Sequence, residues 1–108
     1  MPIISNNVSV AANSVSANVL AGELFEYLPN MTVVQVFATG SAAGLRATYS
    51  IGGELQLDDG VINANNRAPI IPDDLLLKAG GRRGERQILK FRNTTGGALT
   101  ANYLLQIG

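Results

Sequence analysis

The sequence predicts an all-β domain: an antiparallel β-sandwich, jelly-roll-like, with an extended N-terminal arm. Apolar and polar residues alternate in several short runs, of which Leu45–Ile51 is the most regular. Turn-forming residues, mostly Gly, Asn and Asp, separate these runs, and no segment shows a sustained period of 3.6 residues. Eight or more short strands with turns between them are typical of a sandwich or jelly roll.

The N-terminal segment, residues 1–22, carries no charge and is rich in Asn, Ser, Ala and Val. A flexible tail would usually be more charged and less β-branched. We therefore expect these residues to form an extended arm or the first strands, lying on their own domain or on a neighbour. Residues 23–108 are expected to form a single sandwich domain. The valines expected to make the contacts of the arm are Val8, Val10, Val15 and Val19.

The middle of the chain predicts strands at residues 24–28, 33–39, 45–51 and 54–57. Gly52-Gly53 is expected to form a two-residue hairpin turn. Asp58-Asp59-Gly60 is expected to form a second turn, in which glycine supplies the positive φ, before a short strand from Val61. Asp73-Asp74 either cap one helical turn over residues 75–77 or precede a strand over residues 75–78.

The C-terminal residues predict a β-hairpin in which Phe91 lies opposite Leu99, with a loop at Asn93–Gly97. Leu104 interrupts the polar outer face of the last strand, so this face is expected to be partly covered by another strand or subunit. The side chains expected to point into the core are Leu89, Phe91, Leu99, Ala101, Tyr103, Leu105 and Ile107.

Charge is unevenly distributed along the chain, although the net charge is zero. Residues 1–45 hold two acids and no base, residues 46–77 five acids and two bases, and residues 78–92 six bases and one acid. This polarity suits head-to-tail contacts between copies, or an acidic partner for the basic loop. In such contacts we expect Arg82, Arg83 and Arg86 to meet acids such as Asp58, Asp59, Asp73 and Asp74. A solvated basic loop is the alternative.

The composition excludes several kinds of chemistry. There is no His and no Cys, so Ser-His-Asp and Cys-His catalysis and typical zinc sites are excluded. We expect no catalytic residue, no cofactor and no metal ligand, and hence no enzyme. Calcium bound by Asp58, Asp59 and nearby carbonyls is the remaining metal alternative, although the spacing is not that of an EF-hand. The apolar runs are too short for a membrane-spanning helix.

The Gly80–Arg86 loop combines glycine with arginine but does not match a phosphate-binding P-loop. It contains no aromatic residue, and the zero net charge argues against a nucleic-acid partner.

The uncharged N-terminal arm, the low charge content and the Phe91–Ile107 segment together resemble small structural proteins of bacteriophage virions. The resemblance is to proteins that decorate or cement capsids and to minor capsid proteins, and it matches no motif that would transfer a specific residue. It implies a homo-oligomer, a trimer or pentamer, bound in the virion to the major capsid protein or other virion proteins. A carbohydrate-binding β-sandwich module is the alternative, followed by a nucleic-acid-binding β-barrel.

Overall fold

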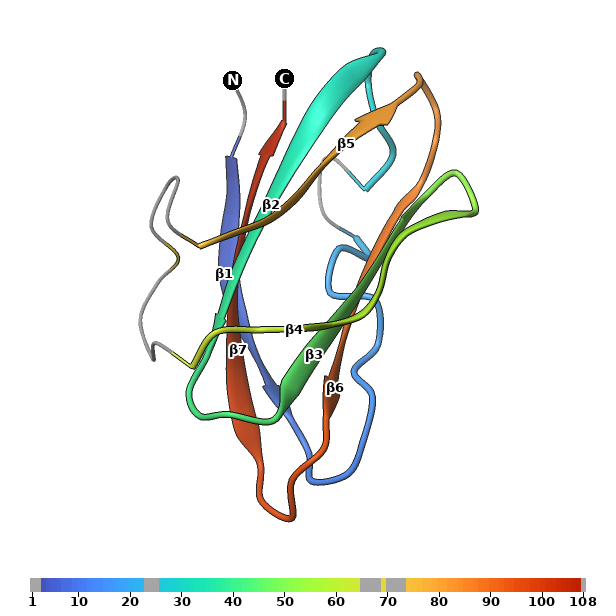
Figure 1. The fold of residues 1–108 in the computed structure, drawn as a ribbon. Helices are drawn as coiled ribbons and strands as arrows, with labels where there is room; N and C mark the ends of the chain where they lie inside the picture. Colours follow the sequence, from blue (N-terminus) through green and yellow to red (C-terminus); the bar gives the residue numbers. More distant parts are fainter. Residues whose placement is uncertain (1–2, 23–25, 65–68, 70–73, 108) are drawn as a thin grey trace.

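The computed structural model describes residues 3–22, 26–64, 69 and 74–107, which contain seven strands. They form two antiparallel sheets that face each other (Figure 1), one with the order β1-β7-β2-β5 and one with the order β4-β3-β6. The predicted antiparallel β-sandwich is confirmed, with seven strands in the described residues where eight or more were expected. The strands are β1 (Ile3–Val10), β2 (Thr32–Gly40), β3 (Leu45–Ile51), β4 (Glu54–Val61), β5 (Leu75–Gly81), β6 (Gln87–Asn93) and β7 (Leu99–Ile107).

The core lies between the two sheets, and strict alternation of side chains builds it. Every second residue of β3 is buried, as is every second residue of β6 and of β7 after Leu99. The rings of Phe91 in β6 and Tyr103 in β7 meet across the layers, with centroids 5.8 Å apart. The predicted inward set of the C-terminal strands is thus confirmed, with Leu99 half-buried at the rim.

The segment 13–19 takes the place of an eighth strand along the free edge of β6. The backbone N–H groups of Ser16 and Val19 donate to the carbonyls of Phe91 and Leu89, at 2.8 and 2.9 Å. Side chains complete the ladder: Ser16 Oγ accepts from the N–H of Phe91, and Asn18 Oδ1 accepts from the N–H of Leu89. With this segment included, the chain passes between the sheets in a jelly-roll order.

The N-terminal segment therefore belongs to the sandwich of its own chain. β1 pairs with β7 from Ile3↔Gln106 to Val10↔Leu99 without a break in register. Of the two structures expected for residues 1–22, the described part adopts that of the first strands, because Ile4 and Val10 of β1 are buried in the core of their own chain.

The predicted C-terminal hairpin is wrong, because β6 and β7 lie in different sheets. The loop after Asn93 crosses from one layer to the other, so Phe91 faces β7 across the core instead of pairing beside Leu99. Alternation cannot distinguish these arrangements, since both bury the same side chains. The buried Asn93 side chain fixes the crossing: its Nδ2 donates to the carbonyls of Val10 and Gly97, and its Oδ1 accepts from Thr95.

The predicted turn at Asp58-Asp59-Gly60 is also wrong, because β4 continues through it to Val61. The register of β4 against β3 shifts here and again one pair further along, so β4 is a bulged strand. Asp59, not Gly60, has the positive φ, 54°, which Asp tolerates better than most residues. The turn at Gly52-Gly53 is confirmed, with φ values of 59° and 85°.

Of the remaining strand predictions, some are confirmed, and one lies partly outside the described residues and is otherwise replaced by an isolated bridge. Strands at 33–39 and 45–51 are confirmed, and residues 75–78 form a strand rather than a helical turn. Residues 24–25 of the predicted strand 24–28 lie outside the described residues. Tyr27 makes an isolated bridge to Arg86 instead of a strand. The described part of the chain holds no helix able to cross a membrane.

Candidate functional site

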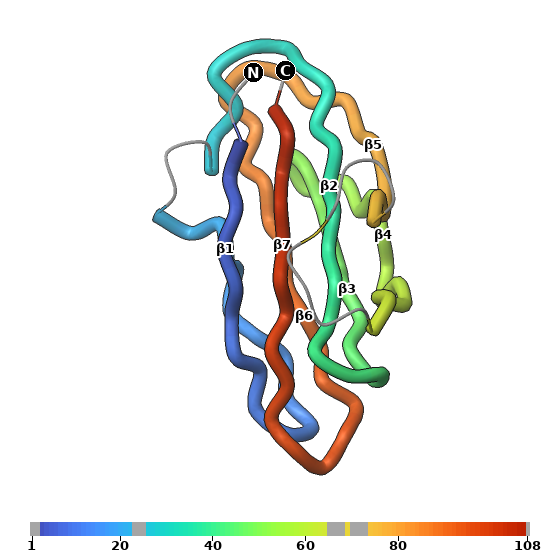
Figure 2. The backbone as a smooth tube through the Cα atoms, turned by 90° about the vertical axis from the view of Figure 1, so that its left-hand side faces the viewer, coloured from blue at the N-terminus to red at the C-terminus, as the bar shows by residue number. Residues whose placement is uncertain are grey.

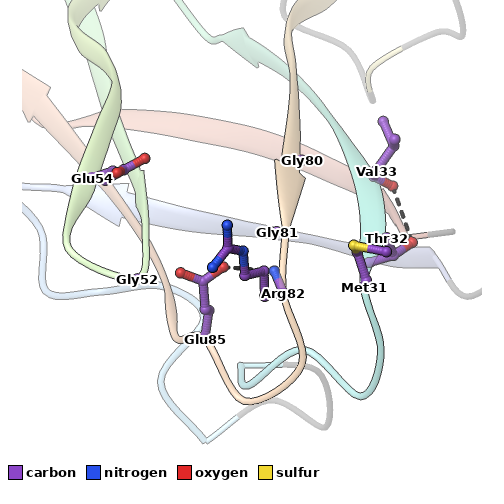
Figure 3. Close-up of a pocket in the computed structure, with 9 residues that line it drawn as sticks. All are labelled: Met31, Thr32, Val33, Gly52, Glu54, Gly80, Gly81, Arg82 and Glu85. Carbon is purple, nitrogen blue, oxygen red and sulfur yellow. Dashed lines mark hydrogen bonds between the residues drawn. The ribbon is translucent and has the colours of Figure 1, made fainter.

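An open cleft of about 540 Å³ lies at the end of the sandwich where β2 begins and β5 ends. Its walls are the start of β2, the turn between β3 and β4, and the loop that follows β5 (Figure 3). Glu54, Arg82 and Glu85 bring charge to the cleft, and Met31 and Val33 bring exposed apolar surface.

The basic loop on the wall of this cleft is a tight turn held by Glu85. Its carboxylate accepts a hydrogen bond from the backbone N–H of Arg82 at 2.6 Å, and its own N–H donates to the Arg82 carbonyl. Gly84 supplies the positive φ of 84°. The carboxylate lies directly against Gly52, where a Cβ would collide with it. Arg82 and Arg83 are therefore presented to solvent by a constrained backbone.

Two of the charged residues predicted to meet another copy are paired within this chain. Arg86 Nε donates to Glu26 at 2.6 Å. Arg92 binds both carboxylate oxygens of Asp59, at 2.9 and 2.5 Å. Arg82, Arg83 and Asp58 are exposed and form no ion pair with any other described residue. These three remain as candidates for head-to-tail contacts between copies, whereas Asp74 is buried and Asp73 lies outside the described residues.

These ion pairs lower the pKa values of both carboxyl groups. The pKa of Asp59 lies below its ordinary value because of the hydrogen bonds from Arg92. The pKa of Glu26 is lowered first by the backbone N–H of Gly22 and then by Arg86. Because the folded-state pKa of Asp59 is depressed, its contribution to stability is present above the unfolded pKa and is lost as the pH falls through the folded pKa.

We predict that the Asp59–Arg92 pair gives a small stability gain that disappears in acid. The substitution Asp59→Asn keeps a residue that tolerates positive φ but removes the charge. The urea midpoint of the wild type should exceed that of the variant at neutral pH, by a modest amount because the pair is exposed. The difference should close as the pH falls below about 4. If the urea midpoints of wild type and variant differed by the same amount at neutral pH and below about pH 4, this prediction would be wrong.

The four valines predicted to contact a neighbour mostly contact their own domain. Val10 is 1% exposed, and Val8 and Val19 pack against the same core. Val15, beside β6, is 57% exposed and is the member of this set that presents a large apolar surface. An interface role for these valines stays a prediction.

The described residues do not bring together a set of oxygen ligands that would support the calcium alternative. In that part of the chain, no three acidic side chains come together in a group able to hold a metal ion. The Asp59 carboxylate is in addition engaged on both oxygens by Arg92.

A second candidate surface is the outer face of the four-stranded sheet, which faces the viewer in Figure 2. Of the side chains that its strands direct outward, Lys78 alone carries a charge. The other sheet differs: Arg46, Lys90, Arg92 and Asp59 lie on its outer side. The uncharged outward positions are Ile3, Ser5, Asn7 and Ser9 of β1, Thr100, Asn102, Leu104 and Gln106 of β7, Val33, Gln35, Phe37 and Thr39 of β2, and Leu75 and Gly80 of β5.

Part of this neutral face is covered by the chain itself. Phe37 and Thr39 of β2 point outward, yet both are completely buried. Asn63 bridges Thr39, and the Asp74 carbonyl accepts from the N–H of Ala38. Phe37, the neighbour of Leu104 in β2, is thus covered by the chain itself, while cover of Leu104 by another strand or subunit stays a prediction. The outward side chains of β1 are exposed, and those of β7 are half-buried.

The neutral face was missed from the sequence because it is assembled from strands far apart in the chain. β1, β7 and β2 contribute four uncharged outward residues each, and β5 contributes two. Only the strand order shows that β1, β7 and β2 lie side by side. The signals present were the chargeless N-terminal segment and the apolar Leu104.

The chain matches no protein-family model and no curated protein sequence. A solved structure, the carbohydrate-binding module CBM36 in complex with calcium and xylotriose, is similar over 100% of both chains, with a TM-score of 0.50 and 13% sequence identity. At this identity the likeness concerns the architecture, and it shows that the chain shares its β-sandwich fold with this carbohydrate-binding module.

Proposed function

We propose that this protein is a structural subunit that assembles with copies of itself, in a virus particle of the bacteriophage kind. The observation that carries the assembly part is the neutral outer face of the four-stranded sheet. Depletion of charge distinguishes the centre of a protein interface from the rest of a protein surface. Here the charges are instead gathered on the opposite sheet and around the cleft.

The chemistry of the neutral face suits contact with an identical face. Asn and Gln side chains both donate and accept hydrogen bonds, so Asn7, Asn102 and Gln35 can pair with the same residues of another copy. An interface between identical faces is self-complementary by symmetry, and the lack of charge avoids repulsion between equal groups. Exposed Ile3 and Val33 add apolar area.

The virion part of the proposal is supported by the resemblance of the sequence and by the fold. Jelly rolls serve as viral capsid domains and also as lectin domains, so the fold alone does not choose between them. In the virion the proposed partners are other copies and the major capsid protein. Contact between identical faces joins two copies, so the trimer or pentamer that the resemblance implies needs a second, head-to-tail contact between different surfaces. The exposed Arg82 and Arg83 are available for an acidic surface of that shell.

We predict that the protein is a homo-oligomer that dissociates when charge is placed on the neutral face. Light scattering should give a multiple of the 11.3 kDa chain mass. The double variant Ser5→Glu/Asn7→Glu should lower that mass to 11.3 kDa, because both residues are exposed on this face and each interface would bury several like charges.

The matched control is Asn30→Glu/Gln56→Glu, which adds the same charge at exposed positions outside the neutral face. This control should keep the wild-type mass. A wild type of 11.3 kDa at all concentrations would overturn assembly through this face.

Carbohydrate binding in the cleft is the second candidate, favoured by the likeness to a carbohydrate-binding module. Glu54, Arg82 and Glu85 would supply hydrogen bonds to sugar hydroxyl groups. Among the described residues, however, Tyr27 is the one strongly exposed aromatic side chain available for stacking on a sugar ring.

Affinity electrophoresis in gels containing xylan, with and without calcium, tests this candidate. Retardation that is lost in Arg82→Ala but kept in the nearby Arg83→Ala would establish the cleft as a glycan site, because only Arg82 lines it. Mobility equal to that of a non-binding protein in every gel would remove the candidate.

A further inference from the structure

The sandwich has four strand edges, and three of them are protected against pairing with another chain. The edge of β6 is covered by the segment 13–19. β4 is broken in register at two places and carries Glu54, Asp58 and Asp59. β5 is broken once and carries Lys78. Bulges and charges of this kind are what proteins use to prevent edge-to-edge association.

The fourth edge, β1, has none of these protections. Its eight residues contain no charge, no proline and no register shift against β7. Among the described residues, β7 is its one neighbouring strand. Ile3, Ser5, Asn6, Asn7 and Ser9 are all exposed.

Two hydrogen bonds show which backbone groups of β1 point to the open side. The N–H of Ser41 donates to the carbonyl of Thr100, so Thr100 bonds toward the β2 side of β7 and its β1 partner Ser9 faces the open edge. Asn7, two residues away, faces the same way, and its N–H bonds to the Oδ1 of Asn6 at 2.8 Å. In an antiparallel ladder the residues alternate between bonding one side and the other. Ser5, Asn7 and Ser9 therefore present their N–H and C=O groups to the open edge, and pairing with another strand would replace the Asn6 Oδ1 at the N–H of Asn7.

We infer that β1 pairs antiparallel with β1 of a second copy, which joins two four-stranded sheets into one continuous sheet. The inference rests on the proposed self-assembly and adds a contact at the edge of the sheet to the contact through the neutral face. Two identical strands pair antiparallel about a two-fold axis, so the contact is closed and each copy supplies the same groups. β1 is neutral, so no like charges oppose each other across the new ladder. The neutral faces of both copies then form one surface.

The test uses Asn7→Pro in the full chain. Proline removes the edge-directed N–H and leaves the ladder with β7 intact, since the N–H of Asn7 faces the open edge. Asn7→Ala is the matched control, because it keeps the N–H and removes the same side chain. We expect light scattering to show half the wild-type mass for Asn7→Pro and the wild-type mass for Asn7→Ala, with equal circular dichroism spectra. An unchanged mass for a folded Asn7→Pro would overturn the inference.

Amide hydrogen exchange of the wild type gives a second readout if Asn7→Pro does not fold. The N–H groups of Ser5, Asn7 and Ser9 should exchange more slowly at concentrations where the oligomer forms than after dilution to monomer. A stable oligomer in which these amides exchange equally fast at both concentrations overturns β1 pairing and leaves the proposed function standing. A wild type that is monomeric at every concentration overturns both.

Discussion

Replacing Phe91 by alanine is expected to lower the free energy of unfolding by about 3–5 kcal/mol, the usual cost of removing a buried aromatic side chain. Phe91 is completely buried in β6, and its ring packs against Tyr103 of β7 across the two sheets. Deleting it removes apolar burial and leaves a cavity between layers that the backbone hydrogen bonds of both sheets prevent from closing. A domain of this size has a total stability of roughly 5–15 kcal/mol, so the loss is a large part of the whole.

Urea denaturation followed by circular dichroism measures this loss. Lys90→Ala, next to Phe91 but exposed on the outer side, is the matched control and should change the stability by less than about 0.5 kcal/mol. If both variants lost the same amount, Phe91 would not hold the layers together in the way proposed.

Replacing Asn93 by alanine is the substitution expected to have the second largest effect. Its side chain is 1% exposed and bonds four groups: the carbonyls of Val10 and Gly97, and the N–H and hydroxyl of Thr95. Alanine leaves the buried Val10 carbonyl without this donor, and an unsatisfied buried polar group costs about 1–3 kcal/mol. The loop between β6 and β7 loses its organising residue at the same time, so we expect a total loss of about 2–4 kcal/mol.

Asn30→Ala is the control for this substitution, because Asn30 is an exposed asparagine in another loop. In thermal unfolding, Asn30→Ala should melt close to the wild type, while Asn93→Ala should melt roughly 8–30 °C lower, as a loss of about 2–4 kcal/mol implies for a domain of this size. Equal melting temperatures for Asn93→Ala and wild type would show that water replaces the bonds of the side chain.

The sequence was sufficient to predict the class of fold and the inward faces, because alternation of apolar and polar residues has a direct physical reading. Leu45, Ala47, Tyr49 and Ile51 alternate with polar residues and are all buried. Which strands pair with each other was harder to predict. The apolar faces of β6 and β7 are equally well buried in a hairpin and across a sandwich, and a buried asparagine at position 93 decides between them.

The candidate surfaces were less predictable than the fold. Charge counts identified the basic loop, but they could not show that Arg86 and Asp59 find partners at Glu26 and Arg92 of their own chain. The Asp58-Asp59-Gly60 sequence has the composition of a turn, and the bulge arises because β3 continues to pair with β4 on both sides of it. The neutral face depends on strand order, which alternation does not encode.

The pairing of β1 with β7 brings the two ends of the chain together at one end of the sandwich (Figure 2). Since β7 lies between β1 and β2, these two strands cannot be joined into one sheet until β7 has been synthesised. A nascent chain that has emerged from the ribosome only as far as β6 leaves β1 with both edges open and half of the core in water. Folding of this domain is therefore expected to wait until β7 has left the ribosome, and a chain truncated before β7 is expected to be degraded instead of folding as a shortened domain.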